Sequence, residues 1–234
     1  MPYLLARYLA EKAQIEQLRQ TYCPAQPEVR LLAVSKTKPA EDIMTLYNAG
    51  QRDFGENYLQ EALIKQGLLA HFDICWHYIG PIQSNKTKDI ARCFNWVHSV
   101  DRLKIAQRLN HQRPSQSPPL NICLQVNINE EATKSGFLRH ELASVVEPLL
   151  ALGNLRLRGL MAIPRAEQSF EDQNAAFKLL ADTKDALNQQ FNLQMDTLSM
   201  GMSADLKAAI SQGSTIVRIG TAIFGAREKR LTKR

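Results

Sequence analysis

The stretch Leu31-Leu32-Ala33-Val34-Ser35-Lys36 is an apolar run that ends in a lysine. A short continuous apolar run is typical of a parallel β-strand that is buried on both faces. Pro39 follows, and a helical pattern extends from there to Gly50, because proline suits the first turn of a helix and glycine its C-terminal cap. This unit predicts an α/β fold in which Lys36 lies at the carboxyl end of a buried strand.

The same alternation of strand and helix signals continues along the chain. Seven further strands are predicted near residues 52–54, 76–79, 96–99, 120–128, 155–162, 197–200 and 215–219. Helical patterns follow nearly all of them, including 57–69, a segment from Asp101, 168–190, and a segment that Ser203 caps and Gly213 ends. Alternating strands and helices favour a parallel sheet, and eight such units predict a closed (β/α)8 TIM barrel. An open, doubly wound sheet is the alternative.

An additional helix is expected before the first strand. Residues 3–20 place Leu4, Tyr8, Ile15 and Leu18 near one helical face. No linker, internal repeat or low-complexity segment divides the chain, so we expect residues 1–234 to form a single domain. Residues 226–234 carry five basic side chains against one acidic side chain and are predicted to be a basic C-terminal tail.

The composition excludes several classes of protein. Hydrophobic residues make up 44% of the 234, so a substantial core can form, and no apolar stretch is long enough to span a bilayer. The N-terminus lacks the pattern of a signal peptide. The net charge of +6 comes largely from the tail, which we interpret as a solvated terminus because no nucleic-acid-binding module accompanies it. We therefore expect neither a nucleic-acid nor a membrane partner.

The cysteines and histidines indicate no metal site. Four cysteines are scattered without a C-x-x-C pair or metal-ligand spacing to His77 or His98: Cys23, Cys75, Cys93 and Cys123. Free thiols are typical of a reducing compartment, so the protein is predicted to be cytoplasmic. His77 lies inside a predicted strand, where a hydrogen-bonded core histidine is expected.

Lys36 is a candidate nucleophile. Burial at the mouth of a barrel would lower the pKa of its amine, and a neutral amine is what forms a Schiff base with an aldehyde. The alternative for Lys36 alone is a strand-end lysine whose amine reaches solvent.

A phosphate-binding site is predicted after the last two strands. Gly201 and Gly220 allow close approach of the backbone, and hydroxyl groups are offered by Ser199, Ser203 and Thr221. A helix starting after Ser203 would present free N–H groups, and phosphate sites recur after strands seven and eight of such barrels. The alternative is a purely structural role, in which Gly201 and Gly220 are turn glycines and Ser203 is a helix N-cap. The structural role and phosphate binding are compatible, because both use the same backbone groups.

Two further polar residues belong to this predicted site. Arg218 precedes Gly220 by two residues, so both face the barrel mouth if the strand is regular. A buried arginine needs a partner, and a phosphate, a ligand nitrogen or a carboxylate such as Glu56 would serve. Asn57 lies in the loop after strand two and would either cap a helix or reach the ligand.

A lysine on strand one and a phosphate site after strands seven and eight together indicate pyridoxal 5′-phosphate (PLP). The segments that carry these residues also resemble one family. Seven segments, at residues 32–39, 54–58, 77–86, 134–136, 158–164, 198–203 and 217–225, are similar to the pyridoxal phosphate homeostasis proteins. The resemblance runs from about residue 30 to 227.

The resemblance implies the fold of the N-terminal barrel of alanine racemase. It implies that Lys36 holds PLP as an internal aldimine, with Ser199, Gly220 and Thr221 near the phosphate and Asn57 close to the cofactor. Arg218 would face the pyridine nitrogen or reach toward the phosphate. An arginine at the ring nitrogen disfavours its protonation and weakens the electron sink that PLP enzymes use.

The resemblance favours a carrier of PLP over an enzyme. It implies a cytoplasmic, monomeric protein without a catalytic residue that buffers, carries or regulates PLP in vitamin B6 homeostasis. Its loss would disturb amino-acid and keto-acid pools, and PLP-dependent apoenzymes or B6-pathway enzymes are candidate partners. An amino-acid racemase is the alternative, although related racemases use an additional C-terminal β-domain for which we expect no room after the barrel. Lys38, Lys134 and Lys233 are candidate docking lysines, with solvated surface lysines as the favoured interpretation.

Overall fold

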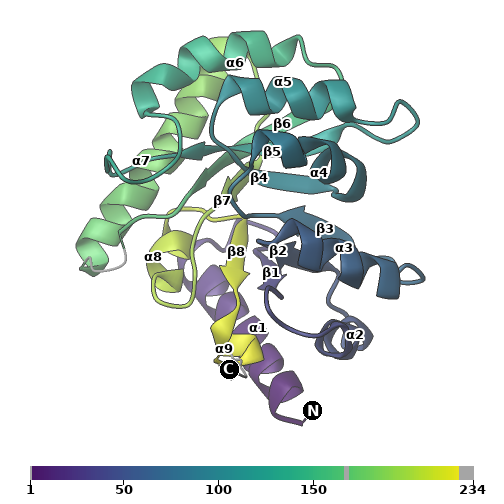
Figure 1. The fold of residues 1–234 in the computed structure, drawn as a ribbon. Helices are drawn as coiled ribbons and strands as arrows, with labels where there is room; N and C mark the ends of the chain where they lie inside the picture. Colours follow the sequence, from purple (N-terminus) through teal and green to yellow (C-terminus); the bar gives the residue numbers. More distant parts are fainter. Residues whose placement is uncertain (1, 166–168, 227–234) are drawn as a thin grey trace.

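The computed structural model describes residues 2–165 and 169–226, and their strands form a closed parallel barrel (Figure 1). The strands pair in chain order, and the last pairs with the first. In order they are β1 (Arg30–Val34), β2 (Asp53–Glu56), β3 (Cys75–Tyr78), β4 (Trp96–Val100), β5 (Leu120–Val126), β6 (Leu155–Ala162), β7 (Thr197–Ser199) and β8 (Ile216–Ile219). The predicted (β/α)8 barrel is confirmed, and the open-sheet alternative is wrong.

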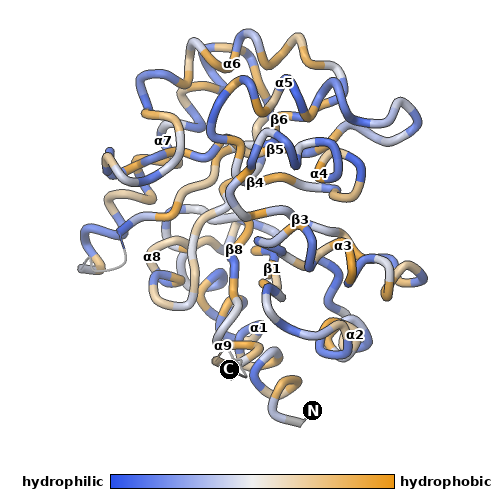
Figure 2. Tube along the Cα trace, viewed as in Figure 1, coloured by the Kyte–Doolittle hydropathy of each residue, from blue (hydrophilic) through white to orange (hydrophobic). Residues whose placement is uncertain are grey.

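Helices cover the outside of the barrel. They are α1 (Pro2–Tyr22), α2 (Ala40–Asn48), α3 (Leu59–Leu68), α4 (Thr87–Cys93), α5 (Leu103–Gln112), α6 (Leu142–Leu150), α7 (Phe170–Phe191), α8 (Leu206–Ser211) and α9 (Thr221–Phe224), with short 3-10 turns η1 (Ser84–Lys86) and η2 (Arg139–Glu141). Figure 2 shows hydrophobic and hydrophilic residues alternating around these helices, the pattern of helices that pack on a core by one face. None of the described helices is long and apolar enough to cross a membrane.

The predicted N-terminal helix is confirmed as α1. It packs against α8, α9 and α2 on the outside of the barrel, beside β8 and β1 (Figure 1). Tyr8 and Ile15 are buried in this contact, and Leu4 and Leu18 pack at its edge. The helix therefore supports the sector of the barrel where the first and last strands meet.

Several boundaries differ from the sequence prediction. Helix α8 begins at Leu206 rather than directly after Ser203, because the Asp205 carboxylate accepts a hydrogen bond from the Met202 N–H at 2.5 Å and closes a turn ahead of the helix. Ser203 is exposed and is not the N-cap, so that prediction is wrong. Helix α3 begins at Leu59 instead of Asn57. The predicted basic tail, including Lys233, lies outside the described residues apart from Ala226.

Candidate functional site

A pocket of about 360 Å³ opens at the carboxyl ends of the strands. Six of the predicted site residues line it: Lys36, Asn57, Ser203, Arg218, Gly220 and Thr221. They meet because β8 pairs with β1, in a register that places Ala33 opposite Ile219. Residues near the start and the end of the barrel sequence thus share one wall of the pocket. The volume of the pocket is within the size range of small-molecule sites.

Lys36 lies in a tight turn two residues beyond the end of β1. It is half-buried, and the next residue, Thr37, has a left-handed backbone with φ of 64°. A non-glycine residue pays a strain energy for that conformation, which persists only where the surroundings enforce it. Here the Thr37 N–H donates to Glu61 Oε1 of α3 at 2.5 Å. Helix α3 therefore fixes the turn from which Lys36 projects.

A buried ionic network centred on Lys65 also supports the turn that carries Lys36. Lys65 of α3 is 4% exposed, and its Nζ donates to the Ser35 carbonyl at 2.7 Å, to Glu56 Oε1 at 2.8 Å and to Glu61 Oε1 at 2.5 Å. The Ser35 hydroxyl also donates to Glu56 Oε1, at 2.6 Å. Burial raises the pKa of Glu56, and the Lys65 ammonium opposes that rise. Sequence reasoning missed Lys65, and its only signal was a lysine on the apolar face of a predicted helix.

Backbone groups beside the pocket are suited to an anion. Among the described residues, the N–H groups of Ser203, Ala204 and Thr221 have no hydrogen-bond acceptor, and all three residues line the pocket. Gly220 lies against β1, where a Cβ would stand 3.3 Å from the Val34 carbonyl oxygen. The site therefore offers several unused backbone donors close to Lys36, as anion-binding loops do.

The structure places Ser199 and Gly201 beneath the pocket lining rather than in it. Ser199 is fully buried, and its hydroxyl lies 2.7 Å from His98 Nδ1 and 3.0 Å from Arg218 Nη1. Gly201 has φ of 97°, and a Cβ on it would stand 2.5 Å from the Ala209 side chain. In this structure Gly201 permits the close packing of α8 and Ser199 contacts Arg218, and their roles near a phosphate stay predictions.

Arg218 forms the floor of the pocket. It is 5% exposed, and its guanidinium donates to the Ser199 carbonyl at 2.5 Å, to the Ser199 hydroxyl and to the Ala162 carbonyl at 3.0 Å. Burial lowers its pKa to about 10, an effect that the nearby Asp205 carboxylate opposes, so the group is charged at neutral pH. Glu56, one partner considered from the sequence, is instead bound by Ser35 and Lys65. Of the five guanidinium N–H donors, two are left for a ligand.

Asn57 supplies an amide group to the pocket. Its Oδ1 is buried and has no hydrogen-bond partner among the described residues. Its backbone is held by a close contact with Gly80, where a Cβ would clash with the Asn57 carbonyl. A buried polar atom without a partner costs free energy, so this amide is suited to a polar ligand atom.

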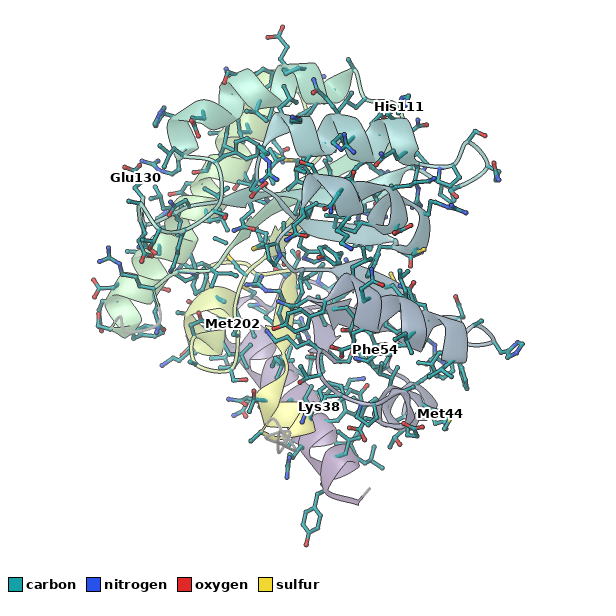
Figure 3. The ribbon with its side chains drawn as sticks, viewed as in Figure 1. Lys38, Met44, Phe54, His111, Glu130 and Met202 are labelled. Carbon is teal, nitrogen blue, oxygen red and sulfur yellow. The ribbon has the colours of Figure 1, made fainter. Side chains whose placement is uncertain are left out.

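The described lysines proposed as docking sites are not simply solvated. Lys38 Nζ donates to the Phe224 and Ala226 carbonyls at 3.1 and 2.9 Å, which ties the turn after β1 to α9 (Figure 3). Lys134 pairs with Glu131 at 2.7 Å and lies 3.3 Å from the Pro164 carbonyl. Both amines therefore contact loops at the pocket end of the barrel while the side chains stay partly exposed, and a docking role stays a prediction.

A second polar cluster lies inside the barrel. Asp53 Oδ1 is 2.8 Å from His77 Nε2, and Cys75 Sγ is 3.3 Å from the same nitrogen. The expected hydrogen-bonded core histidine is confirmed, but the statement that no cysteine stands at ligand spacing to His77 is wrong, because residues two apart on a strand share a face. Burial raises the pKa of Cys75 to about 12, and all four cysteines are free.

Comparison with known proteins agrees with this fold. A family model described as the alanine racemase N-terminal domain matches residues 10–228. A pyridoxal phosphate homeostasis protein of Pseudomonas aeruginosa is 57% identical over 216 residues, covering 92% of each chain. The protein of that name from Escherichia coli is 47% identical over 231 residues, 96% of this chain and 97% of the relative.

Solved structures show the same fold. PipY of Synechococcus elongatus, which has been solved with PLP bound, is 36% identical and aligns with a TM-score of 0.80 over 90% of this chain and 99% of PipY. An alanine racemase of Clostridium difficile aligns with a TM-score of 0.70 at 14% identity, over 95% of this chain and 58% of the racemase, which shows a shared fold alone. The fold and the pocket define a barrel of the alanine racemase N-terminal type. The chain belongs to the pyridoxal phosphate homeostasis protein family.

The buried network under the Lys36 turn predicts a large effect of Lys65→Met. Removing one partner of a buried ion pair leaves uncompensated charge, so we expect the free energy of unfolding in urea to fall by about 3–5 kcal/mol. Adding Glu56→Gln to Lys65→Met should recover part of the loss. The control is Lys178→Met, which removes an exposed (i, i+4) pair with Asp182 and should cost less than about 1 kcal/mol. Equal effects at the two positions would contradict the proposed role of the network.

Proposed function

We propose that this protein binds PLP at Lys36 and buffers, carries or regulates the cofactor in vitamin B6 homeostasis, without catalytic turnover. The observation that carries the proposal is the pocket itself, in which a half-buried lysine, a buried arginine and unused backbone N–H donors meet. The family supports it, since its relatives are named for pyridoxal phosphate homeostasis and PipY has been solved with PLP.

The residues of the pocket match the three functional groups of PLP. Bound PLP supplies an aldehyde, a ring nitrogen and a phosphate. Lys36 supplies the amine that forms a Schiff base with the aldehyde. The N–H groups of Ser203, Ala204 and Thr221, with the exposed Thr221 hydroxyl, would bind the phosphate. Asn57 would bind a polar group of the ring.

Arg218 is assigned to the ring nitrogen rather than to the phosphate. The candidate phosphate donors Ser203, Ala204 and Thr221 lie on exposed residues at the rim, whereas Arg218 is buried at the floor. A guanidinium can only donate hydrogen bonds, so it pairs with an unprotonated ring nitrogen. That pairing withholds the positive ring charge on which most amino-acid chemistry of PLP depends, and it favours binding over turnover.

The rim of the pocket suits exchange of the cofactor. The rim is lined by three exposed residues, Thr37, Ser203 and Thr221, and the floor is buried. We propose that PLP enters and leaves across this rim without opening the barrel. We propose that PLP-dependent apoenzymes or B6-pathway enzymes receive the cofactor from this open face. We also propose a cytoplasmic, monomeric protein, and the four unpaired cysteines fit a reducing compartment.

We predict that Lys36→Ala abolishes the visible absorption of the Schiff base formed with added PLP. The matched control is Lys38→Ala, which also changes a lysine of the pocket, but one whose amine is tied to α9. Parent and Lys38→Ala should keep the band, and borohydride reduction followed by peptide mass analysis should locate the adduct on Lys36. A band that persists in Lys36→Ala, with the adduct on another lysine, would overturn this assignment.

We also predict no racemase, transaminase or decarboxylase turnover with common amino acids. The PLP-loaded parent is incubated with each amino acid, and chiral chromatography follows the products. The physical reason is the donor-only contact of Arg218 with the ring nitrogen. Turnover that survives repurification and disappears in Lys36→Ala would establish the racemase alternative or another PLP enzyme.

A further inference from the structure

A continuous chain of hydrogen-bonded polar side chains, buried except at Asp53, crosses the interior of the barrel. Asp53 of β2 lies 2.8 Å from His77 Nε2, and His77 Nδ1 lies 2.9 Å from His98 Nε2 of β4. His98 Nδ1 lies 2.7 Å from the Ser199 hydroxyl, which lies 3.0 Å from Arg218 Nη1. The chain begins at the first residue of β2 and ends at the floor of the pocket. His77, His98 and Ser199 are each 0% exposed.

The two ends of the chain fix the direction of every hydrogen bond. The Asp53 carboxylate only accepts, so His77 Nε2 must carry a proton and donate it. In neutral His77 the Nδ1 then accepts from His98 Nε2, and neutral His98 accepts at Nδ1 from the Ser199 hydroxyl. The Ser199 oxygen in turn accepts from Arg218, which only donates. Both histidines are thereby assigned as neutral rings with the proton on Nε2.

The surroundings of the two rings agree with this assignment. Burial lowers the pKa of His77, and burial together with the charges of Arg218 and Arg30 holds the pKa of His98 well below its ordinary value. Burial alone would raise the pKa of Asp53, but its hydrogen bond from His77 and the charge of Arg30 lower it overall. Asp53 is therefore an ionised acceptor. The Trp96 ring stacks on the His77 ring, with an angle of 8° between the ring planes and 5.6 Å between the ring centroids.

The same cluster could be mistaken for a cation site. The ligand atoms of Asp53, Cys75 and His77 lie within 4.8 Å of one another. However, Arg30 Nη1 stands 3.6 Å from Asp53 Oδ1, and the Cys75 thiol stays protonated. A cation there would face a guanidinium and displace the proton of His77 Nε2. These contacts favour the hydrogen-bonded chain.

We propose that Asp53, His77, His98 and Ser199 are positioning residues for Arg218, and that their chain transmits occupancy of the pocket to the far end of the barrel. The inner layers of such barrels are usually filled by branched aliphatic side chains, and burying polar groups there is costly unless each is paired. Here each member is paired, and the bonds of a continuous chain polarise one another. A ligand that accepts from the two remaining donors of Arg218 therefore alters the hydrogen bond at His77. The identity of that ligand as PLP rests on the proposed function.

The first test reads the rings directly in protein without added PLP. Two-bond ¹H–¹⁵N spectra of ¹⁵N-histidine-labelled protein distinguish the two neutral tautomers and the cation. The other three histidines, His71, His111 and His140, are exposed and serve as internal references. We expect His77 and His98, identified with His77→Gln and His98→Gln, to be neutral with the proton on Nε2 at pH 7. An Nδ1-protonated or charged ring at either position overturns the proposal, as does loss of the His77 Nε2 proton on titration with Zn²⁺.

The second test adds PLP to the same sample. Binding should shift the ring resonances of both His98 and His77 in the parent, and Ser199→Ala should abolish the shift at His77 and weaken PLP binding about tenfold. The control is Ser214→Ala, the same change at a fully buried serine whose hydroxyl bonds to the Met200 carbonyl and is outside the chain. It should leave both the shift and the affinity as in the parent. An unchanged His77 in PLP-bound parent, or equal responses in the two variants, overturns the coupling. If the parent does not bind PLP, both the proposed function and the coupling are wrong. The positioning role is then decided by the first test, which measures the histidine tautomers without PLP.

Discussion

The pairing of β8 with β1 is the contact on which the whole site depends. Its register sets Leu32 opposite Arg218 and Ala33 opposite Ile219. The turn that carries Lys36 continues from one strand, and Gly220 and Thr221 continue from the other. Helix α1 packs outside this seam against α8 and α9. The Lys36 amine and the backbone around Gly220, which are far apart in the sequence, therefore meet only because the barrel closes.

Two buried polar networks hold the pocket from opposite sides. Under the Lys36 turn, Lys65 and Glu61 fix the backbone of Ser35 and Thr37. Under the floor, carbonyl oxygens of β6 and β7 and the Ser199 hydroxyl hold Arg218. A site whose groups are already placed loses less conformational entropy when a ligand binds. Such a frame, with an exposed rim, is suited to the proposed binding and exchange of a small molecule.

The elements with strong local signals could be predicted from the sequence. The apolar runs predicted the strands. The places of Lys36 just after β1 and of Gly220 and Thr221 just after β8 predicted that these residues would line the pocket. Side-chain direction at a strand end could not be predicted, so the contacts of the Ser199 hydroxyl with His98 and Arg218 did not follow from the sequence, and its place near a phosphate stays a prediction. The start of α8 also differed, since the Asp205 side chain closes a turn that hydrophobic periodicity does not detect. Contacts between strands, such as His77 with His98, depend on the stagger of the closed barrel, and the burial of Lys65 depends on how α3 packs.

The central claim is that one pocket, made by the closure of β8 onto β1, binds PLP through Lys36, Arg218 and the backbone around Gly220. A crystal structure of the parent protein grown with PLP tests it most directly. The account predicts continuous electron density from Lys36 Nζ to the cofactor, with the ring nitrogen at Arg218 and the phosphate beside Gly220 and Thr221. Cofactor density joined to a different lysine, or a phosphate remote from Thr221, would contradict it.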